Sequence, residues 1–115
     1  MQSDSDFITA ADATLDAIGR ALDDALARSD VDLDWNVNDG ILTVEGGDGG
    51  KLIVNRHVPN RELWVAARAG GYHFRPLAGR WMDTRNGDEL SAALTRLLKS
   101  QMGLDVAPGT LPAPA

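Results

Sequence analysis

The spacing of apolar residues changes twice along this chain, and these changes limit the folds that it can adopt. In residues 5–28, apolar side chains recur every three or four positions, which places them on one face of an amphipathic helix. In residues 31–37 the period drops to two, as in a half-buried strand. The helical period returns over residues 88–101. The chain therefore predicts a helix, a set of strands and a second helix, in that order.

Glycine, asparagine and proline divide the middle of the chain into short stretches with strand character. These are residues 31–37, 41–45, 51–57, 62–68 and 72–75, with a sixth candidate at 80–83. Because the turns between them are short, neighbouring strands are expected to run antiparallel. One sheet and two helices are buried most simply when both helices pack on the same face. The predicted fold class is therefore α+β: a two-layer sandwich with an antiparallel sheet of five to six strands.

Residues 1–106 are expected to form this single domain, which is long enough for a hydrophobic core. Residues 107–115 are rich in proline and alanine. We expect them either to be disordered or to lie as an extended cover on the surface.

Composition excludes several classes of protein. The chain has no cysteine, which excludes disulfides, thiolate metal sites and cysteine nucleophiles. It has no apolar run near the roughly 20 residues of a membrane helix, and no basic region followed by an apolar stretch at its start. We therefore expect a cytoplasmic protein that does not bind membranes. The net charge of −6 argues against binding to nucleic acid, whose phosphates need clustered lysine and arginine.

The negative charge is concentrated in the first third of the chain. Residues 1–34 contain nine aspartates and two arginines, a formal charge of −7, so the remaining residues sum to about +1. Such an end favours cationic partners, either metal ions or basic protein surfaces. Carboxylates spaced along a surface without histidine or cysteine make weak, open sites for hard cations. The candidate metal ligands are Asp12, Asp16, Asp23, Asp24, Asp30, Asp32 and Asp34.

These aspartates form one surface only if the first helix and the first strand run side by side. The alternative is a solvated polar face that binds no metal. Gly19, Arg20 and Arg28 interrupt the acidic stretch. We therefore expect Asp23, Asp24, Asp32 and Asp34 to contribute before Asp12 and Asp16.

Trp64 is the second candidate site. In the strand over residues 62–68 it alternates with apolar neighbours and shares a face with Glu62 and Arg68. Aromatic side chains on a polar face concentrate at interfaces. The alternative is that Trp64 packs against Ile53 and its neighbours as surface cover. His57 and His73 are expected to be surface polar residues.

Several local sequences of the chain, taken together, resemble those of one family. They are Asp30-Val31-Asp32-Leu33-Asp34, Asp39-Gly40-Ile41-Leu42-Thr43-Val44, Ile53-Val54-Asn55-Arg56, Leu63-Trp64-Val65-Ala66 and Gly70-Gly71-Tyr72-His73-Phe74. At these spacings the chain resembles the frataxin family, and most closely its bacterial CyaY branch, over about residues 4–103.

The resemblance implies a two-layer α+β sandwich and weak, reversible binding of iron, as Fe²⁺ or Fe³⁺, through an acidic ridge on the first helix and first strand. It also implies docking on the cysteine desulfurase and scaffold machinery of iron–sulfur cluster assembly. The protein would be a regulator or an iron donor and not an enzyme. The residues implied in docking are Asn55 and Trp64 on the open sheet face and Asp23, Asp24 and Asp32 on the ridge.

Two other functions stay open at this point. One is a ferroxidase or iron-storage protein that oxidises Fe(II) at the acidic residues. The other is an acidic adaptor that binds no metal. The protein is expected to be a monomer, and the sequence leaves open an iron-dependent oligomer, the metal stoichiometry and the sign of any regulation.

Overall fold

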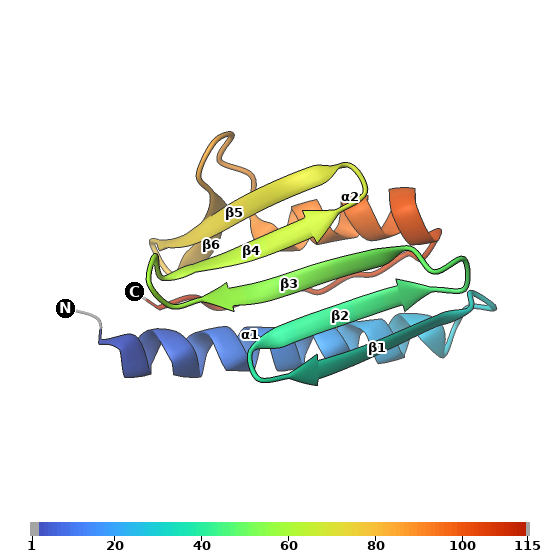
Figure 1. The fold of residues 1–115 in the computed structure, drawn as a ribbon, viewed down its shortest axis with the longest axis horizontal. Helices are drawn as coiled ribbons and strands as arrows, with labels where there is room; N and C mark the ends of the chain where they lie inside the picture. The colour runs from blue at the N-terminus through green and yellow to red at the C-terminus, as the bar shows by residue number, and fades with distance from the viewer. Residues whose placement is uncertain (1–2, 115) are drawn as a thin grey trace.

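Two helices cover one face of a single sheet in the computed structural model, which describes residues 3–114 (Figure 1). The elements are α1 (Asp4–Leu26), β1 (Leu33–Asn38), β2 (Ile41–Gly46), β3 (Lys51–His57), β4 (Glu62–Ala67), β5 (Gly70–Leu77), β6 (Arg80–Asp83) and α2 (Leu90–Met102). The strands lie in sequence order and each pairs antiparallel with the next. The predicted α+β sandwich is confirmed, and its sheet has six strands.

Some element ends differ from the prediction. β5 begins at Gly70, where the sequence indicated a turn, because Ala67 pairs with Gly70 and leaves Arg68 and Ala69 as the turn itself. β1 begins at Leu33 and not at residue 31. The hydroxyl of Ser29 accepts a hydrogen bond from the Val31 backbone N–H instead, so this stretch is a local turn.

The core lies between the sheet and the helices, as the alternation of the strands requires. Each central strand contributes every second side chain to it. Its largest fully buried members are Phe7, Leu15, Ile18, Leu22, Leu42, Leu52, Leu63, Phe74, Trp81, Leu90, Leu94 and Leu98. Burying a side chain of this size contributes about 1.5–3 kcal/mol. The alternate side chains of the same strands form an open face that neither helix covers.

Gly19 explains how closely α1 approaches the sheet. It is buried in the helix, and a Cβ at this position would lie 2.5 Å from Cη2 and 2.6 Å from Cζ3 of Trp35 on β1. Glycine inside a helix costs up to about 1 kcal/mol relative to alanine. Here the absence of a side chain at Gly19 leaves the space that the indole ring of Trp35 occupies.

The tail runs as an extended segment between the two helices (Figure 1). Leu104, Val106 and Leu111 are buried along it. The buried Thr14 hydroxyl donates to the carbonyl oxygen of Pro112 at 3.1 Å. Residues 107–114 thus lie extended along the core, with Leu111 buried among its side chains. Residue 115 lies outside the described part.

Gly19→Ala is expected to destabilise the protein by about 1–3 kcal/mol, because the new methyl group would overlap the indole ring of Trp35. In a Trp35→Ala background Gly19→Ala should instead stabilise the protein, raising the free energy of unfolding by up to about 1 kcal/mol because alanine favours the helix. Urea unfolding of the four proteins measures both effects. A stabilising Gly19→Ala in the presence of Trp35 would contradict the packing described here.

Leu111→Ala is expected to lower the free energy of unfolding by about 2–5 kcal/mol, since the side chain is buried. Thr110→Ala, one residue earlier and exposed, is the matched control and should change it by less than about 0.5 kcal/mol. Equal effects of the two substitutions would mean that the tail does not pack in solution.

Candidate functional site

The candidate metal ligands lie along the edge where α1 packs against β1. Asp16, Asp23, Asp24, Asp30, Asp32 and Asp34 are exposed, and Asp12 is half-buried. Within residues 3–114 no three side chains of histidine, cysteine, aspartate or glutamate are close enough to hold one metal ion. The edge is therefore a dispersed negative surface and not a preformed chelating site. We call it the acidic edge.

Asp12 is engaged by a cation of the protein itself. Nη1 of Arg56 on β3 donates to its Oδ1 at 2.6 Å, and only 18% of the Arg56 side chain is exposed. The guanidinium lies over Gly40, where a Cβ would be 2.7 Å from Cζ of Arg56. A metal ion at Asp12 has to compete with this ion pair, which makes Asp12 the least available of the candidates.

Asp23 is engaged differently. Nε1 of Trp35 donates to its Oδ1 at 2.8 Å and so links α1 to β1. The donor is neutral, so the carboxylate keeps its formal charge. This contact was not predicted, because it depends on how Trp35 of β1 packs over Gly19 of α1.

Asp34, the one aspartate of β1, points away from α1. Trp35 faces the helix, so the alternation of the strand directs Asp34 to the open face. There it lies directly opposite Glu45 of β2. Asp32 lies over the β2–β3 turn, with its Oδ2 2.7 Å from where a Cβ of Gly47 would be. The strand and helix carboxylates thus lie on the two sides of one edge strand.

Asp48, in the β2–β3 turn, is the described group whose pKa is shifted. Its pKa is lowered, first by the backbone N–H of Gly50, which donates to its Oδ1 at 2.8 Å, and second by a hydrogen bond from Arg68. Asp48 is therefore held as the carboxylate partner of Arg68, which balances its charge beside Asp32.

Trp64 lies on the open face, where its indole ring is stacked between two imidazole rings. The ring centroids of His57 and His73 are 3.7 Å and 4.4 Å from that of Trp64. Its Nε1 donates to Oε1 of Glu62 at 2.8 Å. Asn55 lies directly opposite Trp64 in the β3–β4 register.

The positions of Trp64 and Asn55 on this face were predicted, but the stack of three rings was not. Alternation alone puts the three rings on the same side, and the register of β3, β4 and β5 brings them together. The stack and the hydrogen bond to Glu62 together fix the orientation of Trp64.

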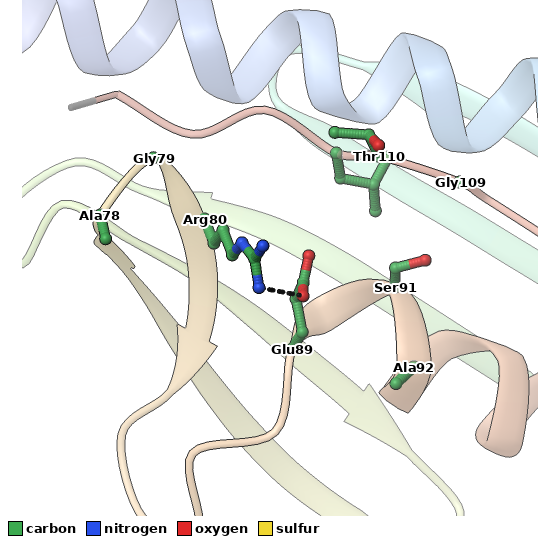
Figure 2. A pocket seen from close by; sticks show the side chains of 9 residues that line it. Ala78, Gly79, Arg80, Glu89, Ser91, Ala92, Gly109 and Thr110 are labelled. Carbon is green, nitrogen blue, oxygen red and sulfur yellow. Dashed lines mark ion pairs between the residues drawn. The ribbon is translucent and has the colours of Figure 1, made fainter.

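A separate cleft of about 500 Å³ lies between the β5–β6 turn, the start of α2 and the tail (Figure 2). An ion pair of 3.6 Å between Arg80 and Glu89 crosses it. None of the candidate residues lines this cleft. It belongs to the packing of the tail and not to the acidic edge.

Comparison with known proteins identifies the family. The family described as frataxin-like domain matches residues 1–104. The iron–sulfur cluster assembly protein CyaY of Ralstonia nicotianae is 46% identical over 104 residues, which cover 90% of this chain and 92% of that protein. The protein of the same name in Paraburkholderia phymatum is 46% identical over 108 residues, which cover 92% and 99%.

Solved structures agree with this result. Frataxin from Psychromonas ingrahamii superposes with a TM-score of 0.77 at 30% identity, covering 94% of this chain and 99% of that one. Trimeric frataxin from Saccharomyces cerevisiae, complexed with ferrous iron, superposes with a TM-score of 0.72 at 27% identity, covering 82% and 86%. The resemblance found in the sequence is confirmed.

The pairing of Asp34 with Glu45 generates a prediction about stability. Like charges directly opposite each other on a sheet are destabilising, so Asp34→Asn is expected to raise the free energy of unfolding by about 0.2–1 kcal/mol at low salt. The gain should shrink in 0.5 M NaCl and disappear in a Glu45→Gln background. Urea unfolding at both salt concentrations measures it, and a gain that survives in Glu45→Gln would contradict the pairing.

Proposed function

The chain belongs to the frataxin family, and on that premise we propose that it serves iron–sulfur cluster assembly as a weak iron-binding regulator or iron donor. Its relatives in Ralstonia nicotianae and Paraburkholderia phymatum carry the name of iron–sulfur cluster assembly proteins. Iron is the cargo of this function and not a resident cofactor.

The observation that carries the proposal is the acidic edge. Its carboxylates are hard oxygen ligands, they are exposed, and they are dispersed along α1 and β1. An ion at such a surface is held by one or two carboxylates and by water, so it exchanges readily. Weak binding suits a protein that must release what it binds. The yeast frataxin complexed with ferrous iron supports iron as the ion.

The partner in this proposal is the cysteine desulfurase, together with the scaffold machinery of cluster assembly. The acidic edge would meet a basic surface of the desulfurase, which raises the association rate and fixes orientation. The open face would add contacts through Asn55 and the stacked Trp64. The edge and the open face meet at β1, so a single partner can reach both.

Iron and the desulfurase compete for the same charges in this scheme. Each bound cation reduces the negative potential that attracts a basic partner surface. Iron occupancy therefore changes how strongly the protein docks, and this change is the regulatory signal. The same competition makes docking sensitive to ionic strength.

The ferroxidase alternative predicts a different observation. An enzyme that oxidises Fe(II) with O₂ turns over many equivalents of iron per chain, and oxygen consumption measures this directly. Turnover that is lost in Asp23→Asn/Asp24→Asn would replace the regulator proposal by an enzymatic one.

Docking is tested with two substitutions in different parts of the surface. Asp23→Lys/Asp24→Lys is expected to weaken binding to the desulfurase by at least about tenfold, equivalent to about 1.4 kcal/mol. Trp64→Ala should weaken it by removing an aromatic contact. Surface plasmon resonance at low and moderate salt gives both affinities.

The control for the charge reversal is Asp88→Lys/Glu89→Lys. It changes the net charge equally and also affects two adjacent residues, but these lie at the start of α2, where they pair with Arg96 and Arg80. It should bind almost normally. Full binding by both the Asp23/Asp24 and the Trp64 variants would refute the proposed docking surface.

A further inference from the structure

The three tryptophans of the chain each donate an indole N–H hydrogen bond, and each does so in a different environment. Trp81 donates to Thr14 in the core at 3.1 Å, and Trp64 donates to Glu62 on the open face at 2.8 Å. Trp35 donates to Asp23 at 2.8 Å. Trp35 is thus the tryptophan whose partner is a candidate iron ligand.

The indole ring of Trp35 is fixed at two points of α1. Its six-membered ring fills the space over Gly19, and its N–H reaches Asp23, four residues later and therefore on the same face of the helix. With the ring fixed, the position of Nε1 is fixed as well. The Asp23 carboxylate is in turn held by Nε1.

The two engaged carboxylates of the acidic edge differ in a way that matters for cations. Asp12 is bound by the guanidinium of Arg56, which cancels its charge. Asp23 is bound by a neutral donor through Oδ1, so its charge is not cancelled, and no side chain among residues 3–114 donates a hydrogen bond to its Oδ2. The described side chains of Asp16, Asp24 and Asp32 have no such partner and must lose rotational freedom when they bind an ion.

We propose that Trp35 is a positioning residue of the acidic edge: its indole N–H orients Asp23 so that Oδ2 binds a metal cation from a pre-arranged position. This inference rests on the proposed function, because it assigns a role to Trp35 only if the edge binds metal. Gly19 is part of the same arrangement, since any side chain there displaces the ring. Because the Asp23 side chain is already ordered, it loses less conformational entropy when a cation binds, which corresponds to a gain in cation affinity of about two- to tenfold.

The test compares Fe²⁺ affinities, measured anaerobically from the broadening of backbone amide resonances, in four proteins. Trp35→Phe keeps an aromatic ring over Gly19 but removes the donor, and it is expected to weaken Fe²⁺ binding by about two- to tenfold. Trp81→Phe removes an indole donor from the core, outside the acidic edge and the docking surface, and is the matched control, with unchanged affinity expected. Asp23→Asn should weaken binding at least as much as Trp35→Phe.

The double variant Trp35→Phe/Asp23→Asn separates positioning from a general structural effect. If Trp35 acts through Asp23, the double variant binds Fe²⁺ no more weakly than Asp23→Asn alone. Independent, additive losses would overturn the proposal. Urea unfolding of each protein shows whether it is folded under the conditions of the titration.

The wild-type protein provides a second readout that needs no substitution. On addition of Fe²⁺, the indole N–H resonance of Trp35 should broaden together with the backbone amides of Asp23 and Asp24, while that of buried Trp81 stays sharp. Amides that broaden around Asp23 without a change at Trp35 would overturn the role of Trp35. If Asp23→Asn leaves Fe²⁺ binding unchanged, the proposed metal surface itself fails at this residue. If Asp23→Asn weakens binding and Trp35→Phe does not, only the positioning role fails.

Discussion

The sheet is covered on one side only, and the alternation of side chains along its strands decides where every candidate residue lies. Leu63 and Val65 are buried beneath the helices, and Trp64 between them faces the open side. On β1 the same rule separates Asp34 from Trp35. A shift of any strand by one residue would exchange its buried and open sets, so the buried apolar face fixes the open face as well.

The formal charge of the first third overstates what is available to a ligand. Three aspartates show three environments: Asp12 is neutralised by Arg56, Asp23 is oriented by a neutral indole, and Asp34 is opposed by Glu45. A cation gains little from Asp12, whose charge is already balanced. At Asp23 it meets a carboxylate that is already oriented. At Asp34 it relieves the repulsion between Asp34 and Glu45. The acidic edge is therefore graded, although all its members are the same residue type.

The sequence was sufficient for the fold and for the broad position of the acidic residues, because both depend on local periodicity. The contacts that give the aspartates different environments join residues that are far apart in the chain. Arg56 and Asp12 are 44 positions apart, and the donor of Trp35 reaches back 12 positions to Asp23. Such contacts follow from register and from the packing of a helix on a strand, which no single segment specifies. The stack of His57, Trp64 and His73 was missed for the same reason, and so was the burial of Leu111 by two helices.

The dispersal of the carboxylates has a physical reason that connects stability to the proposed function. Three carboxylates arranged around one ion would repel one another in its absence, by about 1 kcal/mol per pair at 4 Å even in bulk water and by several times more near a protein surface. A domain with a total stability of about 5–15 kcal/mol would lose a large part of it whenever the ion was released. Spreading the same charges along α1 and β1 reduces this loss, and it reduces the affinity for the ion for the same reason. A protein that passes iron on has to remain folded without it, so the weakness of the site and the stability of the metal-free fold are two consequences of one arrangement.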